Sequence, residues 1–238
     1  METITRTRRD CPVEASFLVR PNTSDIKAVD EVWKKNSYQY KTFKIGTSER
    51  WLDLGANVGG FSVFAGLKGN EVIAVEAEAQ CYQITKENLA LNGLGSTALY
   101  EGCVMPESYP ENHVRFYVHD RPLALRRNSI YEPKKFAEAI DVPVYKVSSL
   151  VAAHQPTCVK ANIEGVEIPM VLEEPGWISG LDKFVLEWSF DKDKKIATLE
   201  KALGILRRNF EHVLVNKNYH GLTEWNFYPP NAFIYCHN

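Results

Sequence analysis

A glycine-rich loop with an acid at its entrance is the feature of this sequence that most clearly suggests chemistry. The segment Asp53-Leu-Gly-Ala-Asn-Val-Gly-Gly60 separates an expected buried strand, 50–54, from a helical run that begins at Phe61. Glycines let the backbone turn sharply and approach a ligand closely, and the first turn of a helix presents unpaired N–H groups. Glu76 ends the next expected strand, where a carboxylate is well placed to accept hydrogen bonds from ribose hydroxyls. The pattern predicts a site for a nucleoside-containing cofactor.

The order of residues in this loop distinguishes two classes of cofactor. A dinucleotide site favours G-x-G-x-x-G around a pyrophosphate, whereas the order here is G-x-N-x-G-G after Asp53. An acid beside the loop would repel a pyrophosphate but suits a cationic ligand. S-adenosylmethionine (SAM) carries both a sulfonium and an ammonium group. The loop therefore favours SAM over NAD, and a glycine turn without a ligand is the remaining alternative.

Three further side chains are candidates for proton transfer, because they lie at the ends of expected strands. Glu164 and Glu187 end or follow the strands expected at 157–163 and 182–188, and His119 follows a third strand. A hydroxyl group has a pKa far above 7, so methyl transfer to it is helped by a base or a metal ion that draws off the proton. Each residue also has a plainer interpretation. Glu164 would cap a helix, Glu187 would form an ion pair, and His119 would have no catalytic role.

The long connection over about 105–155 is expected to cover an acceptor pocket. Within it, Arg126 and Arg127 would suit an anionic acceptor such as a nucleotide sugar, or they are simply solvated. The aromatic segment 219–228 offers Trp and Tyr faces for stacking on sugar rings, or side chains that close the core. These features are compatible with a hydroxyl-rich acceptor but do not identify it.

Alternating strands and helices position all of these groups at one edge of a sheet. Strands are expected at 17–20, 50–54, 71–76, 97–104, 157–163 and 182–188, with extra strands at 113–118 and 142–147 and a closing pair at 211–217 and 232–236. Helices are expected at 25–36, from 61 onward, at 78–92, from Ser148 or Ser149 to His154, at 166–173 and at 196–209. This pattern predicts an α/β domain with a largely parallel sheet, whose ligands bind beyond the carboxyl ends of the strands.

The composition fits a globular protein and excludes several other classes. The chain has 238 residues, 45% hydrophobic and 24% charged, which argues against disorder and collagen. A net charge of −2 provides no basic field for nucleic acid, and no apolar run is long enough to span a bilayer. Five cysteines without C-x-x-C spacing indicate a reducing, cytoplasmic environment. The N-terminal cluster Arg6, Arg8 and Arg9 is expected to be solvated and mobile.

Three motifs resemble the FkbM-type, class I SAM-dependent methyltransferases. They are the segment 53–62, Val-Glu-Ala-Glu at 75–78 and Val-Lys-Ala-Asn-Ile-Glu-Gly-Val-Glu at 159–167, and the lead-in at 19–25 is also similar. The resemblance covers about residues 17–190. It implies a Rossmann-like fold with a seven-stranded, mostly parallel sheet and helices on both faces. It also implies O-methylation of a sugar, a glycan or another hydroxylated small molecule.

The same resemblance implies where SAM would bind. The residues expected to contact it are Asp53, Gly55, Asn57, Gly59, Phe61, Glu76, Ala77, Gly102, Cys103 and Asn162. The loop would line the methionine end, Glu76 would hold the ribose and Ala77 would lie against the adenine. Gly102 and Cys103 would lie near the adenine edge, or they simply pack at a strand end. Residues 1–45 would form a lead-in over the cofactor site, and residues 46–238 would form the methyltransferase domain.

Asn162 is the point at which this sequence departs from the family's usual motif, Lys-x-Asp-x-Glu-Gly-x-Glu. Its amide carbonyl still accepts a hydrogen bond from the methionine ammonium. The lost negative charge weakens a divalent-metal site or a carboxylate base at this position, so we do not favour a metal. The alternatives to sugar O-methylation are O-methylation of a non-sugar natural product and a non-catalytic SAM-fold binding protein. RNA methylation is disfavoured by the lack of a basic patch.

Overall fold

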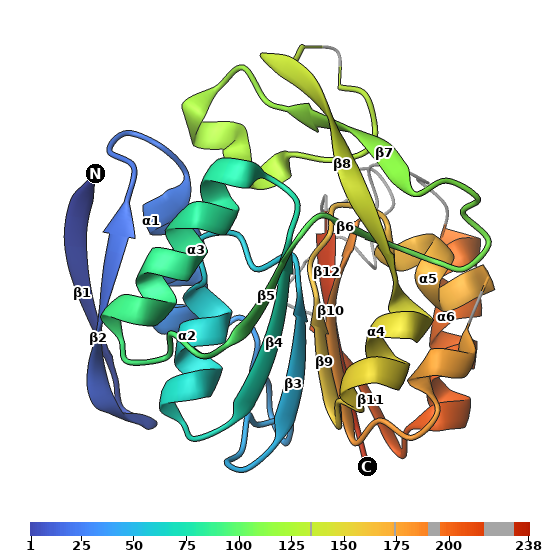
Figure 1. Ribbon diagram of the computed structural model, residues 1–238. Helices are drawn as coiled ribbons and strands as arrows, with labels where there is room; N and C mark the ends of the chain where they lie inside the picture. The colour runs from blue at the N-terminus through green and yellow to red at the C-terminus, as the bar shows by residue number, and fades with distance from the viewer. Residues whose placement is uncertain (134, 174, 190–195, 217–230) are drawn as a thin grey trace.

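The computed structural model has a seven-stranded sheet at its centre (Figure 1). It describes residues 1–133, 135–173, 175–189, 196–216 and 231–238. The strands are β3 (Arg50–Leu54), β4 (Glu71–Glu76), β5 (Ala98–Glu101), β9 (Cys158–Ala161), β10 (Lys183–Ser189), β11 (His212–Val215) and β12 (Asn231–His237). Their order is β11-β12-β10-β9-β3-β4-β5. The successive neighbours β10, β9, β3, β4 and β5 are parallel to one another, and β12 is antiparallel to both of its neighbours, β10 and β11. The predicted α/β class and mostly parallel sheet are confirmed.

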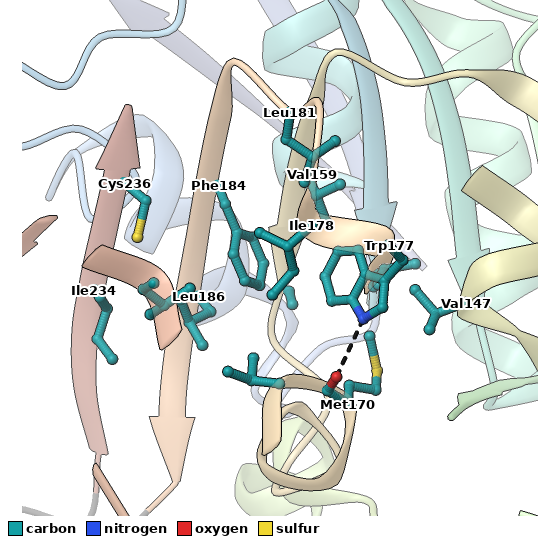
Figure 2. Close-up of a cluster of buried hydrophobic side chains, with 14 of the residues drawn as sticks. Val147, Val159, Met170, Trp177, Ile178, Leu181, Phe184, Leu186, Ile234 and Cys236 are labelled. Atoms are coloured by element: carbon teal, nitrogen blue, oxygen red, sulfur yellow. Dashed lines mark hydrogen bonds between the residues drawn. The ribbon is translucent and has the colours of Figure 1, made fainter. Parts of the chain in front are cut away.

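One face of the sheet is covered by α4 (Val147–His154), α5 (Glu167–Glu173), the 3₁₀ turn η2 (Pro175–Ile178) and α6 (Ile196–Asn209). Side chains alternate along a strand, so Leu52 and Leu54 of β3 enter this core while Trp51 enters the opposite one. Figure 2 shows part of it, where the indole N–H of Trp177 donates to the carbonyl of Met170 at 3.1 Å. This layer supports β9 and β10 from behind.

The opposite face is covered by α1 (Asp25–Trp33), α2 (Gly60–Leu67) and α3 (Ala79–Leu91). The ring of Trp33 packs edge-on against Phe17 and Phe64, with centroids 5.5 and 5.6 Å away. Its indole N–H donates to the carbonyl of Gly60 at 3.1 Å. The end of α1 is thereby fixed against the start of α2, the helix that follows the glycine loop.

The N-terminus is an ordered hairpin, so the expectation of a solvated, mobile start was wrong. Strands β1 (Glu2–Arg8) and β2 (Cys11–Val19) pair antiparallel. Arg6 forms an ion pair with Asp30 of α1 at 2.6 Å, and the guanidinium of Arg8 lies 4.1 Å from the centroid of the Phe64 ring. Arginine side chains have long apolar stems that cover hydrophobic surface while their charges are paired. Arg6 and Arg8 therefore form contacts that the sequence did not suggest, whereas Arg9 is exposed as expected.

The long crossover forms a second, three-stranded sheet in the order β6-β8-β7. It comprises β6 (Cys103–Met105), β7 (His113–Val118), η1 (Pro122–Arg127) and β8 (Glu138–Lys146). The strand predicted at 97–104 is interrupted at Gly102, where a Cβ atom would lie 2.6 Å from the carbonyl oxygen of Pro143. This close approach lets the chain leave the main sheet after β5. Helix α4 begins at Val147, so Ser148 and Ser149 lie within it and do not cap it.

Most other elements lie within a few residues of their predicted bounds, and α6 has the bounds expected for it. The expected helix 25–36 ends earlier, at Trp33, and the expected strand 157–163 ends at Ala161. The second difference matters because it leaves Asn162 and Glu164 in the loop beyond the sheet edge. Among the described residues, no helix is both long enough and apolar enough to cross a membrane.

Candidate active site

Strand β3 ends at Leu54, and the chain turns at Gly55. Gly55 has a φ of +80°, and a Cβ atom there would lie 2.0 Å from the carbonyl oxygen of Asn162. Both facts require glycine, because other residues avoid this φ and the end of β9 leaves no room for a side chain. The N–H groups of Gly55 and Ala56 each donate to the carbonyl of Val75 at 3.0 Å. The loop is thus held between the two strands that flank β3.

A cavity of about 320 Å³ lies beyond the carboxyl ends of β3, β4, β9 and β10, where ligands bind in open α/β sheets. The sequence-predicted residues that line it are Gly55, Asn57, Phe61, Glu76, Ala77, Gly102, Cys103, His119, Asn162, Glu164 and Glu187. The lead-in adds Ala28, Glu31, Val32 and Tyr38, and the crossover adds Phe116, Leu125, Asn128 and Ile130. The cavity is therefore assembled from the lead-in, the sheet and the crossover together.

Asp53 and Gly59 are predicted cofactor residues that do not line this cavity. Asp53 is fully buried, with Oδ1 2.9 Å from Nζ of Lys160 and Oδ2 accepting from the Ser62 hydroxyl at 2.5 Å. Lys160 also donates to the carbonyl of Gly55 at 2.7 Å. Asp53 therefore anchors Lys160 beneath the glycine loop, although the sequence suggested contact with the ligand. Gly59 precedes α2 and faces α3.

Glu76 lies at the end of β4 with its carboxylate held in place by two backbone donors. Oε2 accepts from the N–H of Asn57 at 2.7 Å, and Oε1 accepts from the N–H of Glu78 at 2.9 Å. Burial raises the pKa of Glu76 to about 7, even though both hydrogen bonds favour the ionised form. Glu76 lines the cavity as a fixed acceptor, and with a pKa of about 7 both its ionised and its protonated form are populated near neutral pH.

Beyond Glu76 the wall of the cavity is apolar. Ala77 packs against a cluster made by Cys103, Val114, Phe116 and Val142 of the crossover sheet. Burial raises the pKa of the Cys103 thiol, so this group stays protonated and behaves as a small apolar side chain. This part of the cavity suits a flat, weakly polar ring.

The opposite end of the cavity carries polar groups from β9 and β10. The amide nitrogen of Asn162 donates to Oε2 of Glu187 at 2.6 Å and to the hydroxyl of Tyr38 at 3.3 Å. Burial raises the pKa of Tyr38 well above its usual value, so its phenol stays neutral. The amide oxygen of Asn162 is buried and has no hydrogen-bond partner among the residues that the structure describes.

Glu164 and His119 face the same cavity from two different segments. Glu164 has a φ of +53°, which is unfavourable for a non-glycine residue. Its carbonyl accepts from the hydroxyl of Ser129 at 3.1 Å, which ties the crossover to this loop. The backbone N–H of His119 donates to Oδ1 of Asn128 at 2.9 Å. The fold thus brings all three candidate proton acceptors to one cavity.

Glu167, a nearby acid of the same motif, has a structural role. Its carboxylate accepts from the N–H groups of Gly165 and Ser189, each at 2.9 Å. It is fully buried, and burial raises its pKa. Glu167 therefore fastens the loop after β9 to the end of β10.

Several polar residues that line the cavity were missed by the sequence analysis, among them Ser189, Tyr38 and Lys160. Ser189 lies two residues after Glu187, on the same face of β10, and the two-residue period of a strand would have found it. Tyr38 follows α1 in a segment with no periodic pattern, so no signal was present. Lys160 belongs to a noted motif, but its pairing with Asp53 depends on the register between β9 and β3.

Some predictions lie beyond what the structure describes. The side chains of Arg126 and Arg127 and the aromatic segment 219–228 are outside the described part of the chain. Within the described part, no group of three or more His, Cys, Asp or Glu side chains is arranged to hold a metal ion.

No protein-family model and no curated protein matches this chain. Solved structures do, with 236 matching chains. A SAM-dependent methyltransferase of Agrobacterium tumefaciens is 14% identical, with a TM-score of 0.50 over 100% of this chain and 70% of that one. A fibrillarin pre-rRNA processing protein of Methanococcus jannaschii is 11% identical, with a TM-score of 0.51 over 99% of this chain and 82% of that one.

At these identities the likeness shows the fold alone. The chain has the Rossmann-like fold of class I methyltransferases, as the resemblance implied. Neither membership of the FkbM family nor a sugar acceptor follows from it. Because one neighbour is a pre-rRNA processing protein, the fold does not support the expected exclusion of nucleic acid.

Proposed function

We propose that this protein is a SAM-dependent O-methyltransferase of the FkbM type that acts on a hydroxyl group of a sugar or glycan. The observation that carries the proposal is the cavity itself. It brings together the glycine loop, the acid expected to bind ribose hydroxyls (Glu76) and a cluster of polar side chains at the carboxyl edge of the sheet. A non-sugar natural product is the alternative acceptor.

The residues present fit SAM at each end. Gly55 lets the loop turn along the cavity wall, where the backbone of Asn162 leaves no room for a side chain, and Glu76 offers two fixed oxygens to a ribose diol. The apolar wall around Ala77 accommodates an adenine ring, and the unpartnered oxygen of Asn162 accepts from an amino group. When bound, SAM supplies an electrophilic methyl group on a sulfonium. The protein must then orient the acceptor hydroxyl and take its proton.

For that proton we propose Glu164 as the first candidate and His119 as the second. Both line the cavity, and Glu164 lies in the loop directly after β9. A carboxylate or neutral imidazole within hydrogen-bond reach of the hydroxyl accepts its proton as the new C–O bond forms. Holding the oxygen in line with the methyl group contributes as well.

We propose that the transfer needs no divalent metal. Asn162 replaces the acid of the usual motif, and its amide nitrogen faces Glu187. Asn162 can then offer only its neutral carbonyl oxygen, which is a weak ligand for a hard cation. Activity should survive EDTA, whereas loss of activity with EDTA and its rescue by magnesium would contradict this proposal.

The direct test is binding followed by transfer. Calorimetry should show binding of SAM and S-adenosylhomocysteine but not of NAD. Incubation with methyl-labelled SAM and a panel of sugars, glycans and hydroxylated natural products should then transfer label to a sugar. Transfer of label only to a non-sugar acceptor would show that the acceptor class is wrong, and absence of SAM binding would refute the whole proposal. SAM binding without transfer to any member would favour a non-catalytic protein.

The compartment is a separate proposal. All five cysteines are buried, free thiols, which is typical of a reducing environment. We therefore place the protein in the cytoplasm.

A further inference from the structure

The contact between Asn162 and Glu187 suggests a role for Glu187 other than proton transfer. Asn162 follows β9 and Glu187 lies within the neighbouring strand β10, and the amide nitrogen of Asn162 lies 2.6 Å from Oε2 of Glu187. Glu187 is buried, with 6% of its surface exposed. A short hydrogen bond to a buried carboxylate is strong because its partner is charged.

This contact determines which way the amide faces. An ionised carboxylate only accepts hydrogen bonds, so it must face the NH₂ group of Asn162 and not its oxygen. The hydroxyl oxygen of Tyr38 accepts a hydrogen bond from the same NH₂ group at 3.3 Å. The carbonyl oxygen is therefore turned away from both residues. It is buried and has no hydrogen-bond partner among the described residues, which is costly unless a ligand supplies a donor.

The position of this oxygen indicates which donor it receives. The backbone of Asn162 abuts Gly55, so the side chain stands beside the glycine loop where β3 and β9 meet. Ribose hydroxyls belong at Glu76, which ends β4 on the other side of β3. At the methionine end of SAM, the carboxylate only accepts and the sulfonium has no donor. The amino group is the donor that remains.

We infer that Glu187 is a positioning residue that orients the amide of Asn162 to accept a hydrogen bond from the amino group of bound SAM. This inference rests on the proposed function and deepens it. It removes Glu187 from the candidate bases. It also explains why an amide suits position 162, because an aspartate there would place two carboxylates in contact.

Two ligands that differ only at the amino-acid end provide the test. S-adenosylhomocysteine and 5′-methylthioadenosine share adenine, ribose and a thioether, but the second lacks the amino and carboxyl groups. The ratio of their dissociation constants, measured by calorimetry on the full chain, isolates recognition of the amino-acid end. Adenine and ribose contacts cancel in this ratio, as do general effects on folding.

We expect Asn162→Ala and Glu187→Leu each to raise the dissociation constant of S-adenosylhomocysteine by about 10- to 100-fold, as for loss of a hydrogen bond to a charged group. Binding of 5′-methylthioadenosine should be unchanged. In Glu187→Gln the ratio of the two dissociation constants should lie within about 5-fold of the parent's ratio, because the amide oxygen of the new side chain accepts from Asn162. Glu71→Leu is the matched control, since Glu71 lies exposed at the amino end of β4. It should leave both affinities unchanged.

Each other outcome is decisive. A parallel loss of both ligands in Glu187→Leu would show a merely structural role, and an unchanged ratio would show that Glu187 does not act through Asn162. Failure of Glu187→Gln to restore the ratio would also overturn the inference. If the parent protein binds both ligands equally, the inference fails while the proposed function stands. If it binds neither, both fail.

Discussion

Glu76 is a carboxylate whose protonation should couple cofactor binding to pH. Burial raises its pKa to about 7 from 4.5, and a ribose diol donates hydrogen bonds most strongly to the ionised form. S-adenosylhomocysteine should therefore bind about 10-fold more tightly at pH 8 than at pH 6, with release of a proton. Calorimetry in two buffers of different ionisation enthalpy measures both quantities. An affinity independent of pH would contradict the ribose role.

The same residue predicts how stability depends on pH in the absence of ligand. A pKa raised in the folded state stabilises the protein fully below pH 4.5, and this contribution is lost as the pH rises through about 7. The loss should approach about 3 kcal/mol by pH 8. Glu76→Gln should abolish this part of the pH dependence of the free energy of unfolding, measured in urea. The variant should be less stable than the parent at low pH, because its NH₂ group cannot accept from one of the two backbone N–H groups that the carboxylate binds. It should also bind S-adenosylhomocysteine more weakly, which separates the two effects.

Glu164 is the residue at which proton transfer can be tested most directly. Glu164→Gln keeps shape and hydrogen bonding but removes basicity, so turnover should fall by about 10²–10⁴ with cofactor binding nearly intact. Turnover within about 5-fold of the parent would exclude a base role. Attention would then move to His119, for which His119→Gln is the corresponding variant.

At the scale of elements, the β3–β9 pair contains a buried ion pair directly under the glycine loop. Asp53 and Lys160 are register partners, with 0% and 3% of their side chains exposed. Removing either partner leaves an uncompensated buried charge, which costs about 3–5 kcal/mol. Asp53→Asn and Lys160→Met should each lower the free energy of unfolding by this amount in urea. The double variant should recover much of the loss, and additive losses would show that the residues act independently.

The elements also show what sequence reasoning reaches. Strand ends converge at one edge of a parallel sheet, so Glu164 and Glu187 were predicted to face one pocket, and both line the cavity. The hydrogen bond between Asn162 and Glu187 was not predicted. The partner of Asp53 was not predictable, because cross-strand register is a property of the folded sheet. Tyr38 gave no periodic signal. The solvated start expected for the N-terminal arginines was wrong for Arg6, which pairs with Asp30, and for Arg8, whose guanidinium lies over the Phe64 ring.

At the scale of the whole molecule, the cavity depends on how the lead-in is held against the sheet. Arg20 forms ion pairs with Asp25 of α1 at 2.9 Å and with Glu78 at 3.3 Å. The carboxylate of Glu78 caps α3, and its N–H donates to Glu76. Arg20 therefore joins α1, which lines one side of the cavity, to the segment that bears the ribose acid.

Replacing Arg20 by Met should loosen this part of the cavity without unfolding the sheet. Asp25 is only 1% exposed, so losing its partner destabilises α1 locally. We expect hydrogen exchange within 25–33 to rise at least about 10-fold while β3 and β4 stay protected, and S-adenosylhomocysteine to bind about 10-fold more weakly. Arg9→Met, at the exposed turn between β1 and β2, should change neither measurement. Unchanged exchange within 25–33 in the Arg20 variant would mean that the packing of Trp33 against Phe17 and Phe64 alone holds the lead-in in place.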